Sequence, residues 1–154
     1  MIKRLKNKER GFGLIEAIIA LGLLGIIGIA FLGALATSST ATIIYDERAT
    51  SESLARSEME YVKSQDYSST PWSYELPSGT SPTGHFPAWW DGDRTLPADY
   101  GNYVVIVEAE WLDPRDDGDD NDDGLQLITV TVIPPQDPET GKPAPTVLEG
   151  YKAS

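Results

Sequence analysis

A single long apolar run near the N-terminus dominates the hydrophobic pattern of the chain. Between residues 12 and 36 the only ionisable side chain is Glu16. At about 1.5 Å of rise per residue, a helix over this run would be roughly 37 Å long, which is enough to cross a bilayer. A cleaved secretory signal has a shorter apolar region, of roughly 7–15 residues. The pattern therefore predicts a membrane-spanning helix over residues 12–36.

Beyond residue 36 the sequence turns polar, but it contains no glycine or proline before Pro71. Its apolar residues recur at spacings that share one face of a helix. We therefore expect one helix to continue unbroken from Phe12 to about Asp66. The apolar face is formed by Ile44, Ala55, Met59 and Val62, and the solvated polar face by Arg48, Glu52, Arg56, Glu60 and Lys63.

Two later segments, Tyr103 to Trp111 and Leu125 to Ile133, alternate β-branched or aromatic residues with polar ones, which predicts an antiparallel pair of strands. Thr146 to Leu148 is a candidate short edge strand. Residues 67–100 are dense in Pro, Gly, Ser and Thr and are expected to form an irregular loop or short strands. For Trp89 and Trp90 we favour packing into the core over an exposed platform for a glycan or protein. The expected fold class is α+β, a ladle with a long N-terminal helix on a small antiparallel β-sheet.

The charge is distributed unevenly along the chain. The first eleven residues carry +4, so the remainder carries −16 of the total of −12. Basic residues before the apolar run place the N-terminus in the cytoplasm and the bulk of the protein outside. The acidic body argues against binding of nucleic acid, which requires a basic patch. Cysteine is absent from the sequence, which rules out disulfides and thiolate metal sites.

The sequence offers little that points to catalysis. His85 is the only histidine, and no nucleophile elbow, phosphate-binding loop or zinc-ligand spacing accompanies it. We therefore expect a protein that is not an enzyme and has no catalytic residues.

The string Glu9-Arg10-Gly11-Phe12-Gly13-Leu14-Ile15-Glu16, followed by the apolar run, resembles the class III signal of type IV prepilins and type II secretion pseudopilins. The resemblance implies that a membrane prepilin peptidase cuts between Gly11 and Phe12 and N-methylates the new amine of Phe12. It also suggests four parts: a basic leader that is removed (1–11), a transmembrane and filament-core helix (12–36), its amphipathic continuation (37–66), and a small β-rich domain (67–154) with an acidic loop at 113–124.

Glu16 is expected to act in assembly. A carboxylate at the centre of an apolar membrane helix costs on the order of 2.5–3.5 kcal/mol, so it needs a positive partner. The resemblance implies that this partner is the Phe12 amine of a neighbouring subunit or of the same chain. The alternative is a carboxylate that reaches back to the membrane interface.

The acidic loop is a candidate calcium site. Asp119-x-Asn121-x-Asp123-Gly124 matches the opening of a calcium-binding loop, although Val130 stands where a bidentate glutamate is usual. With Asp117 as a further carboxylate, these residues form the expected metal site, and the resemblance supports it because several pseudopilins hold calcium in their β-region. The alternative is a solvated acidic loop.

Two segments, 46–49 and 53–61, look like those of I-type minor pseudopilins and related minor pilins, and the apolar run lacks the proline that many major pilins carry. We therefore expect a minor, initiating or tip subunit of a pilus-like filament or pseudopilus. Its expected partners are the prepilin peptidase, other pilin or pseudopilin subunits and an inner-membrane assembly platform. The alternatives are a major pilin of the shaft, or a membrane-anchored binding domain that does not polymerise.

Overall fold

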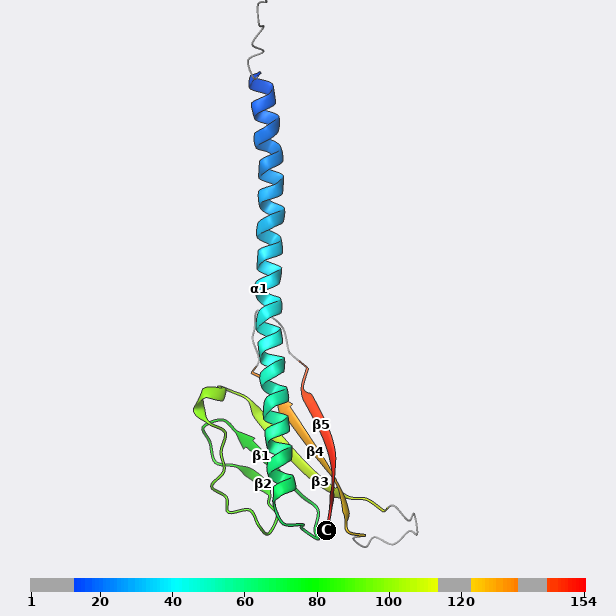
Figure 1. The fold of residues 1–154 in the computed structure, drawn as a ribbon. Helices are drawn as coiled ribbons and strands as arrows, with labels where there is room; N and C mark the ends of the chain where they lie inside the picture. Colours follow the sequence, from blue (N-terminus) through cyan, green and yellow to red (C-terminus); the bar gives the residue numbers. More distant parts are fainter. Residues whose placement is uncertain (1–12, 114–122, 136–143) are drawn as a thin grey trace, which may run out of the picture. The chain divides into compact units, whose positions relative to one another are not determined.

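The computed structural model describes residues 13–113, 123–135 and 144–154 (Figure 1). The chain divides after Thr42 into two compact units, residues 1–42 and 43–154. One long helix is followed by strands and a short 3-10 turn. The elements are α1 (Leu14–Ser64), β1 (Trp72–Pro77), β2 (Thr83–His85), η1 (Ala98–Tyr100), β3 (Val104–Trp111), β4 (Leu125–Ile133) and β5 (Thr146–Ala153). The predicted α+β fold class and the long N-terminal helix are confirmed.

The described part of the first unit is the beginning of α1. Its large apolar side chains between Leu14 and Leu35 are all between 50% and 80% exposed. Toward its end, the hydroxyls of Thr37 and Thr40 donate hydrogen bonds to the carbonyl oxygens of Gly33 and Ala36, four residues earlier, at 3.0 and 3.2 Å. These hydroxyls are therefore satisfied within the helix itself.

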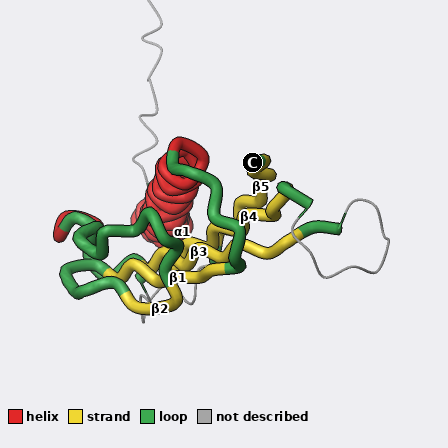
Figure 2. Tube along the Cα trace, turned by 90° about the horizontal axis from the view of Figure 1, so that it is seen from below, coloured by secondary structure: helices red, strands yellow, loops and turns green. Residues whose placement is uncertain are grey.

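The second unit is an antiparallel sheet with the later part of α1 on one face (Figure 2). The strand order is β2-β1-β3-β4-β5. In β3 and β4 the predicted pairing is present, with Val104 opposite Ile133 and Trp111 opposite Gln126. Alternate residues of β1, β3 and β4 are buried, as expected for a sheet with one covered face. The core lies between this face and the helix residues Leu54, Ala55, Met59 and Val62.

Two details differ from the sequence-based expectation. Ile44, placed on the buried face of the helix, is exposed. The edge strand β5 continues past Leu148 to Ala153, with Lys152 buried. The region 67–100 forms the short strands β1 and β2 between irregular segments, which agrees with the prediction. Trp89 and Trp90 pack against the core as favoured, although both rings stay partly exposed.

Candidate functional site

The N-terminal end of α1 holds the described part of the predicted cleavage and assembly site. The carbonyl oxygen of Gly13 accepts the first helical hydrogen bonds, from the backbone N–H groups of Glu16 and Ala17 at 2.9 and 3.2 Å. Glu16 therefore lies in the first turn of the helix, where the partial positive charge of the helix terminus favours a carboxylate. Gly11 and Phe12, the residues of the predicted cleavage, lie outside the described residues.

The Glu16 carboxylate is surrounded by exposed apolar side chains. Leu14, Ile15, Ile18 and Ile19 flank it on α1, and within the described segments no lysine or arginine forms an ion pair with it. Moving such side chains from water into an apolar environment gains about 1.5–3 kcal/mol each. This part of the molecule therefore suits an apolar environment, where a carboxylate is costly unless a cation or the membrane interface stabilises it.

Over the described residues, one helix is long and apolar enough to cross a membrane, and the window that meets this test is fully exposed within the chain. Because these apolar side chains are exposed, the segment is not a helix buried in the core of a soluble domain. The apolar helix thus has the length, composition and exposure of a membrane anchor.

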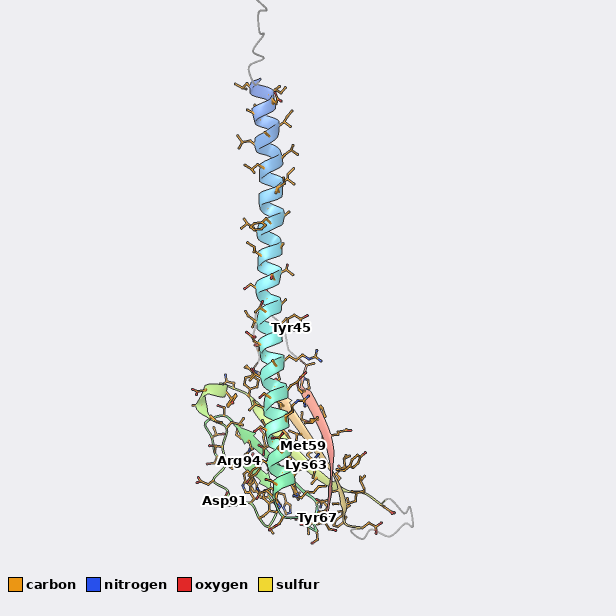
Figure 3. The ribbon with its side chains drawn as sticks, in the orientation of Figure 1. Tyr45, Met59, Lys63, Tyr67, Asp91 and Arg94 are labelled. Carbon is orange, nitrogen blue, oxygen red and sulfur yellow. The ribbon has the colours of Figure 1, made fainter. Side chains whose placement is uncertain are left out.

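A second constellation, which the sequence did not reveal, lies between α1, β1 and the segment before η1. Glu58 on α1 is only 4% exposed. One of its oxygens accepts a hydrogen bond from the Tyr74 hydroxyl at 2.7 Å, and the other lies 2.6 Å from an Nη atom of Arg94. The Arg94 guanidinium lies over the Tyr61 ring, 3.6 Å from its centroid. Figure 3 shows Arg94 beside the C-terminal part of α1.

Burial keeps the Tyr74 hydroxyl protonated. It raises the pKa of the Tyr74 hydroxyl, and the neighbouring Glu58 carboxylate adds to the increase because a phenolate beside it would be a second negative charge. Tyr74 is therefore a permanent hydrogen-bond donor to Glu58 at neutral pH. Both oxygens of the buried Glu58 carboxylate have partners, one on β1 and one in the segment before η1, so the triad Glu58, Tyr74 and Arg94 fixes the helix on the sheet.

A second buried basic side chain, Lys152, caps the C-terminal end of α1. Lys152 of β5 donates hydrogen bonds from Nζ to the carbonyl oxygens of Val62 and Gln65, at 2.5 and 2.6 Å. Val62 lies in the last turn of α1 and Gln65 directly follows its last residue, Ser64, so Lys152 binds carbonyl oxygens at the C-terminal end of the helix. Burial lowers the pKa of Lys152, and nearby Asp66 opposes that effect. Local sequence patterns could not predict these hydrogen bonds, because they join residues that are 90 and 87 positions apart.

Most of the predicted calcium site falls outside the described residues. Asp117, Asp119 and Asn121 are not described, whereas Asp123 precedes Gly124, whose carbonyl oxygen accepts the Ser154 N–H at 2.9 Å. Among the residues that are described, no group of three or more acidic or histidine side chains could hold a metal ion. Calcium binding therefore stays a prediction.

Comparison with known proteins supports the interpretation of the N-terminus. A family model described as the prokaryotic N-terminal methylation motif matches residues 6–32, a stretch that contains Gly11, Phe12 and Glu16. No curated protein and no solved structure matches the chain. The match, the exposed apolar helix and the α+β fold agree with one another. The chain carries the N-terminal methylation motif that is the signal of type IV pilins and pseudopilins.

Proposed function

We propose that this chain is a structural subunit of a type IV pilus-like filament or a type II secretion pseudopilus, processed by prepilin peptidase between Gly11 and Phe12. The observation that carries the proposal is the exposed apolar helix with one embedded carboxylate, Glu16. In the membrane, lipid covers its apolar side chains. In a filament, helices of other subunits cover the same side chains, and the Phe12 amine supplies the cation that Glu16 requires.

The glycines of the apolar helix are compatible with this packing. A Cβ atom added at Gly22, Gly25, Gly28 or Gly33 would meet nothing within 4 Å. Each glycine costs about 1 kcal/mol relative to alanine in a helix interior, so a reason for four of them must lie outside the chain. Small residues allow neighbouring helices to approach closely, which is what a helical filament core requires.

We further propose a minor role for this subunit, at the start or tip of the filament. The I-type character of residues 46–49 and 53–61 supports this, as does the absence of a proline from the apolar run. The expected partners are the prepilin peptidase, other pilin or pseudopilin subunits and an inner-membrane assembly platform. The expected location is the cytoplasmic membrane, with the C-terminal unit outside it, and then the assembled filament.

Processing is tested by expressing the full chain with a prepilin peptidase and measuring the N-terminal mass. We expect loss of residues 1–11 and one added methyl group on Phe12. Retention of the leader in the presence of an active peptidase would refute the proposal and favour a plain membrane anchor.

Assembly is tested in cells that carry the complete filament machinery, with Glu16→Gln as the variant. The matched control is Glu60→Gln, which removes a carboxylate from the exposed face of the same helix. We expect the first variant to be cleaved but absent from sheared filaments, and the second to be incorporated normally. Equal incorporation of both would contradict the role of Glu16. The ratio of this chain to the most abundant subunit in those filaments separates a minor component from a shaft subunit.

A further inference from the structure

Strand β5 has an open edge. It is the last strand of the sheet, at the end opposite β2, and within the described residues only β4 pairs with it (Figure 2). β5 is eight residues long, whereas β2 at the other end of the sheet has three. No proline occurs in β5. An edge strand of this length that lacks proline is a place where another chain can pair.

The register shows which backbone groups of β5 lie on the open edge. The Ser154 N–H binds the carbonyl oxygen of Gly124, one step beyond the pair formed by Leu125 and Ala153. Bonded and non-bonded pairs alternate along an antiparallel ladder, so the even-numbered residues of β5 bond to β4 and the odd-numbered ones point their N–H and C=O groups outward. None of these outward groups has a backbone partner in the described chain. They belong to Val147, Glu149, Tyr151 and Ala153.

The side chains of these odd-numbered residues lie on the uncovered face of the sheet. Val147 and Tyr151 are 54% and 66% exposed, and Glu149 between them is also exposed. The described strand residues of this face include no lysine or arginine. Opposite charges and matched apolar residues stabilise cross-strand pairs. A strand that pairs with β5 would therefore carry a basic residue opposite Glu149 and apolar residues on either side of it.

A groove lies between α1 and the beginning of β5, on the covered side of the sheet. Its volume is about 590 Å³. Successive side chains of a strand point to opposite faces, so every second residue of a strand added to β5 would point toward α1 and into this groove. We call it the helix–β5 groove. The residues that line it include Ile44, Arg48, Glu52, Ala55, Arg56 and Leu148.

The charge pattern of β5 argues against pairing with the β5 strand of a second copy. If two copies paired in antiparallel fashion about Glu149, the two Glu149 carboxylates would lie directly opposite each other. Like charges in that position are destabilising. The open edge thus fits a strand of a different protein, with a basic residue at its centre.

We propose that the open edge of β5 binds an extended segment of another protein as an additional antiparallel strand. Its alternate side chains enter the helix–β5 groove, and a basic residue lies opposite Glu149. Antiparallel pairing matches the rest of the sheet and is the more stable arrangement. Backbone hydrogen bonds supply the affinity, and the side-chain pattern supplies the specificity. The inference goes beyond the proposed function, because it depends neither on cleavage nor on incorporation into a filament.

The first measurement asks whether the edge is open. Amide hydrogen exchange of the full chain in detergent is followed residue by residue by NMR. The N–H groups of Glu149 and Tyr151 should exchange at least about tenfold faster than those of Leu148 and Gly150, which bond to β4. Equal protection of the two sets would mean that another part of the chain covers the edge, which overturns the inference.

The second measurement uses a fluorescent seven-residue peptide with a central lysine and valine or threonine at the other positions. Binding should protect the outward amides of β5 and leave the inward ones unchanged. A control peptide carries N-methyl groups on the lysine and on the residues two positions away, whose amides face β5. Its affinity should fall at least about tenfold, because several backbone hydrogen bonds are lost. A matched peptide with N-methyl groups on the two residues next to the lysine should keep its affinity.

Variants of the chain test the same contact from the other side. Tyr151→Pro removes one outward N–H, a change that an edge strand tolerates when that N–H faces away from the sheet. It should weaken peptide binding at least about tenfold, while Tyr151→Thr, which keeps the N–H, should weaken it much less. Glu149→Lys should bind the lysine peptide poorly and recover affinity for a peptide with a central glutamate. That recovery shows that the variant is folded.

Several results would overturn the inference. One is the absence of peptide binding, and another is binding that N-methylation of the amides facing β5 does not weaken, which indicates a groove ligand without strand pairing. A third is protection of the outward amides that rises with the concentration of the chain alone, which assigns the edge to a second copy. The N-terminal mass and the presence of the chain in filaments report separately on the proposed function.

Discussion

The buried ion pair between Glu58 and Arg94 should account for much of the stability of the second unit. Replacing Arg94 with leucine leaves the Glu58 carboxylate with the Tyr74 hydroxyl as its remaining partner. Removing one member of a buried ion pair costs about 3–5 kcal/mol. The Arg94 side chain is 31% exposed, so water can replace part of the interaction, and we expect a loss of about 2–3 kcal/mol in the free energy of unfolding.

The assay is urea unfolding of the full chain in detergent, followed by tryptophan fluorescence. All four tryptophans lie in the second unit, so the signal reports its unfolding and not that of the apolar helix. Arg48→Leu is the matched control, because it removes an arginine whose ion pair with Glu52 is exposed. Its cost should stay within about 0.5 kcal/mol.

The double variant Glu58→Gln with Arg94→Leu distinguishes a broken ion pair from lost packing. The side-chain amide of this variant still offers an oxygen to the Tyr74 hydroxyl, and no unpaired charge is left in the core. We expect the double variant to recover at least half of the stability lost in Arg94→Leu. If Arg94→Leu costs no more than Arg48→Leu, or if the two changes add to a larger loss, the electrostatic explanation is wrong.

Three further predictions concern the second unit. Lys152→Met should lower the free energy of unfolding by about 1.5–3 kcal/mol, because two carbonyl oxygens at the end of α1 lose a charged donor. Amide hydrogen exchange should become faster in that turn, and Lys152→Arg should retain most of the protection. Above about pH 10 an unfolded tyrosine ionises while buried Tyr74, with its raised pKa, stays protonated, so stability should fall as pH rises. Tyr74→Phe should make that fall shallower in unfolding measured from about pH 9 to 11, and an unchanged slope would contradict the assignment. Millimolar calcium should raise the unfolding midpoint of the full chain, and Asp119→Ala should abolish the increase; an unchanged midpoint in the unmodified chain would remove the calcium hypothesis.

The sequence predicted those elements that depend on neighbouring residues alone. The long helix follows from the apolar run and from the absence of glycine and proline between residue 36 and Pro71. The pairing of β3 with β4 follows from alternation in two segments joined by a turn-rich connection. The motif around Gly11 and Phe12 was equally accessible, because a cleavage signal is read from consecutive residues.

The remaining features depend on contacts between distant parts of the chain. Gly150 interrupts the alternation of β5 and makes the strand look shorter than it is. In the fold, a Cβ atom there would lie 2.9 Å from Met59 Sδ and 3.1 Å from Lys63 Nζ, so glycine is what lets the helix approach the strand. Glu58 likewise looks like one more charge on a polar helix, because Tyr74 and Arg94 are 16 and 36 positions away.

Glu16 and Glu58 both carry a carboxylate in apolar surroundings, where a charge is costly unless a cation pairs with it. The source of that cation differs between the two residues. Glu58 is buried and receives its cation from Arg94 of the same chain. Glu16 lies in an apolar helix, and its proposed cation, the Phe12 amine, exists only after cleavage at Gly11. Cleavage and the charge of Glu16 would then act on one step, so Gly11→Ala and Glu16→Gln should each prevent incorporation into filaments. Combining them should reduce incorporation no further than the more severe single variant. If each variant retains partial incorporation and their effects multiply, Glu16 acts independently of the new amine.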